Sequence, residues 1–184
     1  MADAPTYDAV VLAGGRSRRM HVPDKTALAV GGVPLLDRVL TATAGAASVV
    51  VVGFERPVPR DVTWVQEDPP GGGPAAAVAT ALETVSADLV VLLAGDLPLV
   101  TADAVERLVA AVADDGAVYV DGEGVEQWLC SAWRRSSLRA APLAADGSLR
   151  RALSTLTFAR LPATTAVLDC DTQDDLRRAE EMLT

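Results

Sequence analysis

The sequence predicts a doubly wound α/β domain with a mixed, mostly parallel β-sheet. Short valine-rich runs alternate along the chain with segments of helical periodicity, which is the pattern of parallel strands joined by crossover helices. Half of the 184 residues are hydrophobic but only 4% are aromatic. The core must therefore consist of many small contacts between a Val-rich sheet and Ala-rich helices. Because this length suits one sizeable core, we expect residues 1–184 to form a single domain.

The first half of the chain supplies four expected strands and two helices. The strands cover residues 7–14, 48–54, 62–66 and 88–96. The first helix covers residues 33–45, where Pro34 suits a first turn and the leucines share an apolar stripe with Val39. Residues 67–74, which read EDPPGGGP, cannot form regular structure, and residues 75–85 follow as the second helix.

The second half of the chain mixes strand directions. Thr101 caps a helix whose apolar side chains recur with a period of about 3.6 residues. The short turn DGEG joins strands at 116–120 and 125–133, which favours an antiparallel hairpin. Thr172 and Asp175 resemble a capping box at the start of the last helix. The remaining elements are helices at 134–141 and 148–156, a strand at 165–169 and the helix at 172–183.

The composition excludes several classes of function. The formal net charge of −9 argues against binding to nucleic acid or to an anionic membrane, since both favour a basic surface. The amino-terminal residues contain no basic segment followed by an apolar run, so we expect no signal peptide. The apolar runs are as short as strands, and the two distant cysteines fit a reduced, cytoplasmic protein.

A basic cluster follows the first strand in the stretch LAGGRSRRMHVPDK, residues 12–25. Four basic side chains and one acidic side chain give it a local charge of 4 − 1 = +3; they are Arg16, Arg18, Arg19, Lys25 and Asp24. Gly14 and Gly15 let the backbone bend and approach a ligand closely, and guanidinium groups can then surround a phosphate chain. The stretch is neither a dinucleotide fingerprint nor a Walker loop. The alternative is a tight turn with solvated arginines, and His21 alone predicts no site.

Acidic side chains follow other expected strands. Asp96 ends a very apolar strand in LLAGDLPL, where a divalent metal such as Mg²⁺ is a natural partner. Asp169 and Asp171 share a face of an extended segment, so one of them could join Asp96 in a two-carboxylate metal site. Asp68 in EDPPGGGP could receive the donor groups of a base or sugar. The alternatives are a turn cap at Asp96, a helix-dipole partner at Asp171 and a surface turn at Asp68.

These motifs together resemble the molybdenum cofactor guanylyltransferases of the nucleotidyltransferase superfamily. The best match is VVLAGGRSRRMHVPDKTALAVGGVPLLDRVL, which is similar to that family's L-A-G-G-x(4)-M-x(3)-D-K signature. EDPPGGGPAAAVATAL, LLAGDLPLV and LDCDTQDDLRRAE continue the resemblance over nearly the whole chain. The resemblance implies a Rossmann-like sheet of the nucleotidyltransferase and glycosyltransferase-A type.

The resemblance also implies a role for each matching residue. Leu12, Ala13 and Gly14 would contact the guanine and sugar through their backbone. Gly15, Arg19 and Lys25 would hold the triphosphate, with Arg19, Lys25 and Asp96 forming the catalytic set. Asp68 would contact the nucleoside, Asp96 would bind Mg²⁺, and Asp171 would be a second metal ligand. His21 departs from the family's usual Gly, and Gly53 stands where an Asn can bind nucleotide.

The implied reaction joins GMP from GTP to the phosphate of molybdopterin or the molybdenum cofactor and releases pyrophosphate. Five arginines of the second half are candidates for binding the anionic pterin: Arg134, Arg135, Arg139, Arg150 and Arg151. Contact with cofactor-delivery or acceptor proteins is a further expectation. The alternatives are a related transferase that uses CTP or another phosphorylated acceptor, and a non-catalytic nucleotide-binding module.

Overall fold

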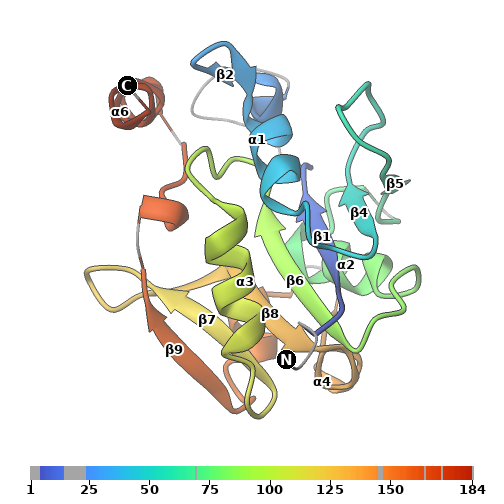
Figure 1. The fold of residues 1–184 in the computed structure, drawn as a ribbon. Helices are drawn as coiled ribbons and strands as arrows, with labels where there is room; N and C mark the ends of the chain where they lie inside the picture. The colour runs from blue at the N-terminus through green and yellow to red at the C-terminus, as the bar shows by residue number, and fades with distance from the viewer. Residues whose placement is uncertain are drawn as a thin grey trace.

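A seven-stranded sheet runs through the middle of the fold (Figure 1). The computed structural model describes residues 5–14, 24–68, 70–144, 147–163, 165–170 and 172–183. The order of strands across the sheet is β5-β4-β1-β6-β8-β7-β9. Their bounds are β1 (Tyr7–Leu12), β4 (Val49–Val52), β5 (Thr63–Val65), β6 (Leu89–Ala94), β7 (Gly116–Val120), β8 (Glu126–Arg134) and β9 (Phe158–Pro162). The short strands β2 (Ala29–Val30) and β3 (Val33–Pro34) pair separately.

The strand directions confirm a mixed, mostly parallel sheet. Strand β1 pairs in parallel with β4 and β6, and β4 pairs in parallel with β5. Strand β8 lies antiparallel between β6 and β7, and β9 is parallel to β7. The carboxyl ends of β1, β4, β5 and β6 therefore meet at one edge of the sheet, which we call the carboxyl edge.

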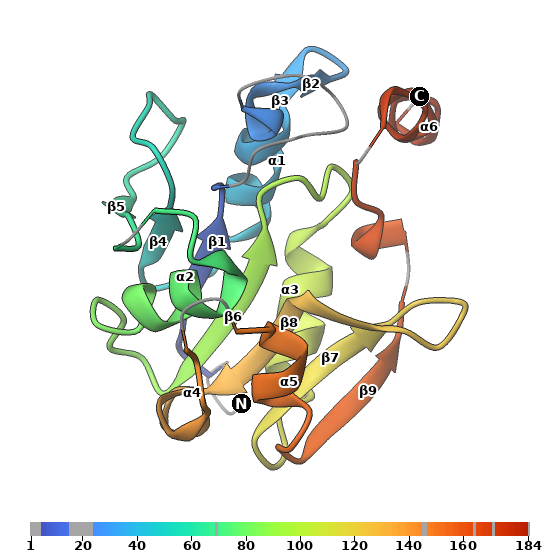
Figure 2. The same cartoon turned by 180° about the vertical axis from the view of Figure 1, so that it is seen from behind.

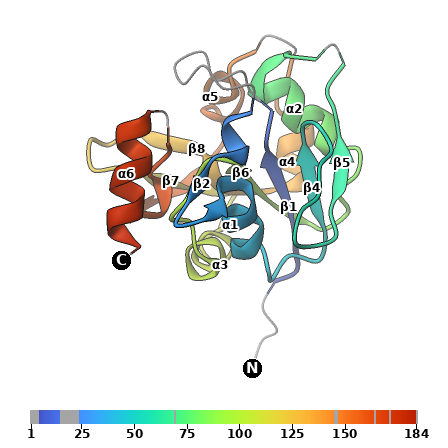
Figure 3. The same ribbon diagram turned by 90° about the horizontal axis from the view of Figure 1, so that it is seen from above.

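Helices cover both faces of the sheet (Figures 1 and 2). Their bounds are α1 (Leu35–Ala42), α2 (Gly73–Ala81), α3 (Ala102–Ala110), α4 (Arg135–Ala140), α5 (Leu149–Leu153) and α6 (Gln173–Met182), with 3₁₀ helices η1 (Lys25–Ala27) and η2 (Thr165–Val167). Side chains of α1 and α3 pack on one face, and those of α2, α4 and α5 pack on the other. Helix α6 stands beside the sheet and contacts β2 (Figure 3).

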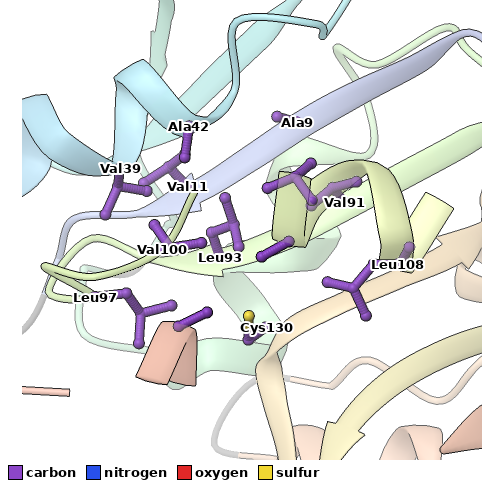
Figure 4. Close-up of a cluster of buried hydrophobic side chains, with 14 of the residues drawn as sticks. Ala9, Val11, Val39, Ala42, Val91, Leu93, Leu97, Val100, Leu108 and Cys130 are labelled. Carbon is purple, nitrogen blue, oxygen red and sulfur yellow. The ribbon is translucent and has the colours of Figure 1, made fainter. Parts of the chain in front are cut away.

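The two faces of β1 explain its uninterrupted apolar character. Ala9 and Val11 point into the core under α1 and α3, where they pack with Val39, Leu93 and other side chains (Figure 4). Val10 and Leu12 belong to the core under α2. Because successive side chains of a strand point to opposite faces, a strand covered on both sides must be apolar at every position.

Several expected elements are confirmed and others are wrong. The β7–β8 hairpin forms, Thr101 caps α3 and Thr172 forms a capping box with Asp175. The strand expected at 165–169 is wrong, because η2 and irregular backbone occupy these residues. The last strand is instead β9, whose half-buried pattern and final proline are typical of a sheet edge.

The boundaries of other elements also differ from expectation. Helix α1 begins at Leu35 rather than residue 33, because β3 takes up Val33 and Pro34. Helix α2 begins inside the expected irregular stretch, at Gly73, with Pro74 in its first turn where a missing N–H costs nothing. None of the helices in the described part of the chain has the length and apolar character that a membrane crossing requires.

Candidate functional site

The ends of three strands meet closely at the carboxyl edge. Leu12 at the end of β1 is in register with Val52 of β4 and Ala94 of β6. Hydrogen bonds continue past the strands, because the Ala13 amide donates to the Val52 carbonyl oxygen at 2.9 Å and the Gly95 amide donates to the Leu12 carbonyl oxygen at 2.9 Å. The backbone after β1 is thus held between the segments that follow β4 and β6.

Two glycines make this close approach possible. A Cβ atom on Gly95 would lie 3.0 Å from the Leu12 carbonyl oxygen and 3.3 Å from the Ala13 Cα. A Cβ atom on Gly53 would lie 3.1 Å from the Ala13 carbonyl carbon, and Gly53 also has a φ of +155°. Gly53, which stands where the family can have Asn, therefore serves here to let the loop after β1 pack against β4.

Lys25 and Asp96 form an ion pair at this edge. The Lys25 Nζ lies 2.6 Å from the Asp96 Oδ2, and the side chains are only 11% and 19% exposed. The two residues are 71 positions apart in the sequence. The fold thus brings together the lysine expected to bind phosphate and the carboxylate expected to bind metal.

A hydrogen-bonded turn holds Lys25 in place. Asp24 caps η1, and its Oδ1 accepts hydrogen bonds from the Thr26 amide at 3.0 Å and the Thr26 hydroxyl at 2.8 Å. Arg56, from the segment after β4, forms an ion pair with Asp24 and donates to the Thr26 hydroxyl at 2.5 Å. Burial lowers the pKa of the Arg56 guanidinium.

The sequence interpretation missed the parts that Asp24 and Arg56 play in this turn. The local charge count treats Asp24 only as a charge that opposes the basic cluster, although an Asp before a short helical turn is a common cap. Arg56 carries a positional signal of the same kind as Asp96, because both follow a strand that ends at the carboxyl edge. No local pattern, however, indicates that Arg56 contacts Asp24.

The segment before α6 also reaches this site. The Cys170 amide donates to the Asp96 backbone carbonyl oxygen at 3.3 Å. Burial, followed by the charges of Asp175 and Asp96, raises the pKa of the Cys170 thiol to about 12. The chain around Asp169 therefore lies beside the loop after β6 as expected, although an irregular segment brings it there instead of a strand.

Other expected site residues lie elsewhere or outside the described residues. Asp68 is exposed in the loop between β5 and α2, at the carboxyl edge, but strands β4 and β1 lie between β5 and β6. The following residues of the sequence analysis lie outside the described ranges: Gly15, Arg16, Arg18, Arg19, His21 and Asp171.

Three of the five arginines expected to bind the pterin line one cavity. Arg134 is in register with Leu89 at the start of β6, so it lies about 20 Å from the carboxyl edge. Arg134, Arg135 and Arg139 line a cavity of about 260 Å³ with Asp88 and Ser136. Helix α4, which carries Arg135 and Arg139, lies at that opposite edge (Figure 1). The expectation that these three arginines serve the Asp96 site is therefore wrong.

The charge of Arg150 of α5 acts on Glu126, which does not line that cavity. A hydrogen bond from Arg160 lowers the pKa of Glu126, and the charge of Arg150 lowers it further. Glu126 begins β8, and β8 runs antiparallel to β6. The first residue of β8 therefore lies toward the edge at which β6 ends.

Asp96 and Lys25 fit the requirements of a magnesium ion that takes its remaining ligands from a bound phosphate and from water. Within the described ranges, no three His, Cys, Asp or Glu side chains gather into a metal centre. Mg²⁺, however, commonly takes one or two protein carboxylates and completes its shell with phosphate oxygens and water. Asp96 beside Lys25 offers a carboxylate for the metal and an ammonium for the phosphate.

Comparisons with solved structures bear out the fold. The molybdopterin-guanine dinucleotide biosynthesis protein A of Archaeoglobus fulgidus is 22% identical, with a TM-score of 0.74 over 96% of this chain and 98% of that chain. The 2-C-methyl-D-erythritol 4-phosphate cytidylyltransferase of Thermus thermophilus is 24% identical, with a TM-score of 0.74 over 95% of this chain and 97% of that chain. Both likenesses concern the architecture of the chain.

Comparisons of sequence identify the family. A molybdenum cofactor guanylyltransferase of Shewanella amazonensis is 33% identical over 63% of each chain. A probable molybdenum cofactor guanylyltransferase of Synechococcus elongatus is 39% identical over 50% of this chain and 51% of the relative. The chain thus spans less than two thirds of the length of these relatives. The model of the MobA-like NTP transferase domain matches residues 9–162. This match covers most of the chain, which belongs to the family of MobA-like NTP transferase domains.

Proposed function

We propose that this chain transfers GMP from GTP to the terminal phosphate of molybdopterin or the molybdenum cofactor. The observation that carries the proposal is the Lys25–Asp96 pair, which lies where three strand ends meet. Related proteins named molybdenum cofactor guanylyltransferase support the choice of substrates.

The proposed reaction is a displacement at the α-phosphorus of GTP. An oxygen of the acceptor phosphate forms a bond to the α-phosphorus, and the bond from that phosphorus to the oxygen bridging the β-phosphate breaks. Pyrophosphate leaves with the electron pair of the broken bond. Because the acceptor phosphate is already ionised at neutral pH, no general base is needed, and catalysis consists of alignment and charge neutralisation.

The residues of this chain divide these tasks. The backbone of Leu12, Ala13 and Gly14 would contact the guanine and sugar, and Asp68 would contact the nucleoside. Lys25, together with Gly15 and Arg19, would bind the triphosphate and offset the charge of the departing pyrophosphate. Asp96, with Asp171 as a second ligand, would hold Mg²⁺, which would neutralise phosphate oxygens when bound.

The ion pair between Lys25 and Asp96 must open when the nucleotide and the metal bind. The lysine ammonium and the aspartate carboxylate are 2.6 Å apart, so phosphate and metal compete with a contact that the protein already makes. Nucleotide binding would move the ammonium to a phosphate while the carboxylate takes the metal. We therefore expect Mg²⁺ and the triphosphate to strengthen each other's binding.

The test of the reaction is pyrophosphate release from GTP, Mg²⁺ and molybdopterin. The Asp96→Asn variant should remain folded and lose this activity. Asp88→Asn is the matched control, because Asp88 is 97% exposed at the opposite edge of the sheet and should be silent. Turnover by Asp96→Asn at the rate of the parent protein would rule out the metal assignment.

The test of the nucleotide is a thermal-shift panel of GTP, CTP, UTP and ATP, each with Mg²⁺. The resemblance associates a Gly-Gly pair after the first strand with guanine, so GTP should give the largest stabilisation. A shift with CTP alone would replace guanylyl transfer by cytidylyl transfer. Binding of GTP without pyrophosphate release in the presence of molybdopterin would indicate a nucleotide-binding module.

A further inference from the structure

Arg56 lies against the turn that carries Lys25, although 30 residues separate Arg56 from Thr26. Its guanidinium forms an ion pair with Asp24 through Nη1 and donates to the Thr26 hydroxyl through Nη2. The side chain is only 22% exposed. Two nitrogens of the guanidinium are therefore engaged by residues that immediately precede and follow Lys25.

The turn itself has little intrinsic stability. η1 contains three residues, and such short 3₁₀ turns have poor hydrogen-bond geometry. The Asp24 cap satisfies the Thr26 amide, and the Leu28 amide donates to the Lys25 carbonyl oxygen at 3.1 Å. The contacts with Arg56 add an anchor from a different part of the sheet, on the side of β4.

The turn also contacts the loop that carries Asp96. A Cβ atom on Gly95 would lie 3.1 Å from the Thr26 Cγ2, so the turn packs closely on the backbone after β6. The Lys25 Nζ contacts the Asp96 Oδ2 on the same side. The turn therefore contacts both Arg56 and the Gly95–Asp96 loop.

We propose that Arg56 is a positioning residue for nucleotide binding: by holding Asp24 and Thr26 on either side of Lys25, it fixes the turn from which the lysine side chain reaches the triphosphate. This inference rests on the proposed function, in which Lys25 binds the triphosphate. Arginine suits the role because its planar fork can reach two acceptors at once, whereas a lysine has one nitrogen.

The experiment measures GTP binding in the presence of Mg²⁺ by calorimetry for Arg56→Gln, Lys25→Ala and the double variant. Arg56→Gln should weaken binding roughly tenfold, and Lys25→Ala should weaken it by roughly 10- to 100-fold, the range of a charged hydrogen bond. If Arg56 acts through Lys25, the double variant should bind no more weakly than Lys25→Ala alone.

Two further variants probe the same link. Asp24→Asn keeps an oxygen that can cap η1 but weakens the contact with Arg56, so its effect should match that of Arg56→Gln and should not add to it. Arg56→Lys keeps the charge but loses the fork, so it should restore only part of the affinity. Thermal unfolding of each variant separates a local effect on Lys25 from a loss of the fold.

Arg60→Gln is the matched control. Arg60 lies in the same segment, but it donates to the Thr43 carbonyl oxygen at 2.8 Å and to the Thr43 hydroxyl at 3.0 Å, at the end of α1. Its loss should lower stability and leave the affinity for GTP unchanged. An Arg60→Gln effect on affinity equal to that of Arg56→Gln would reduce the role of Arg56 to general stability.

The remaining outcomes separate this inference from the proposed function. Unaltered affinity in Arg56→Gln, or additive losses in the double variant, would overturn the positioning role while leaving nucleotide binding intact. Failure of the parent protein to bind any of the four nucleotides with Mg²⁺ would overturn the proposed function, and the positioning role with it.

Discussion

Replacing Asp8 by alanine should destabilise the fold by about 2–4 kcal/mol. This carboxylate lies in the central strand β1 and is 1% exposed. Its Oδ2 accepts hydrogen bonds from the Ser86 amide at 2.7 Å and the Ala87 amide at 2.8 Å, and its Oδ1 accepts one from the Ser48 hydroxyl at 2.7 Å. Alanine would leave both amides without this acceptor, at about 1–3 kcal/mol each. Partial access of water to the Ser86 turn favours the lower part of the summed range.

The same carboxylate should make stability depend on pH. Burial opposes ionisation of Asp8, but hydrogen bonds from the Ala87 amide, Ser48 and the Ser86 amide outweigh it and hold the pKa of this carboxyl below its ordinary value. Because the pKa is lowered in the folded state, the ionised carboxylate makes its full contribution to the free energy of unfolding above the unfolded pKa, near 3.9. This contribution is lost as the pH falls through the folded value. Asp8→Asn, which cannot ionise, should lack this loss.

The assay is urea unfolding of the parent protein, Asp8→Ala and Asp8→Asn between pH 7 and pH 2.5. Asp8→Asn should cost about 1–2 kcal/mol at pH 7, since an amide keeps the shape but loses the charge. The difference between Asp8→Asn and the parent protein should shrink below about pH 4. Asp88→Ala, at an exposed carboxylate of the neighbouring turn, is the control. A stable Asp8→Ala protein, or a difference that does not change with pH, would refute the reasoning.

Three further substitutions have definite outcomes. Lys25→Ala should weaken GTP binding by no more than a few kcal/mol in calorimetry, and unaltered affinity would rule out its phosphate contact. Gly95→Ala should lower the free energy of unfolding by about 1–3 kcal/mol in thermal unfolding, because its Cβ would lie 3.1 Å from the Thr26 Cγ2. It should also weaken GTP binding. Wild-type behaviour in both assays would show that the loops separate easily. Gly116→Ala should cost about 3 kcal/mol or more in urea unfolding, because its Cβ would lie 2.3 Å from the Trp133 Cε3. Gly122→Ala, with open space around it, should be neutral, and equal losses at both glycines would contradict the packing argument.

Local signals in the sequence predict most of the fold. Valine-rich runs become the parallel strands, since a strand covered on both faces needs apolar side chains at every position. Thr101 and Thr172 mark helix starts correctly, because a cap is a contact between near neighbours in the chain. The segment at 165–169 misleads because a short apolar run does not distinguish a strand from a 3₁₀ turn.

The candidate site is also partly predictable from the sequence. Ligand sites in open α/β sheets lie beyond the carboxyl ends of the strands, so motifs that follow strands are expected to gather there. Asp96 and Lys25 meet this rule. Arg134 fails it, because the strand β8 that ends there runs in the opposite direction.

Local patterns are enough to predict the class of fold, the caps of α3 and α6, and that Asp96 follows a strand ending at the carboxyl edge. Which charges meet depends on the tertiary structure. Lys25 contacts Asp96 across 71 residues, Arg56 holds the turn around Lys25, and Asp8 is buried against the turn before β6. Such contacts depend on the order of strands and on the paths of loops. Local propensity specifies neither, because each is settled by packing between segments that are distant in the chain.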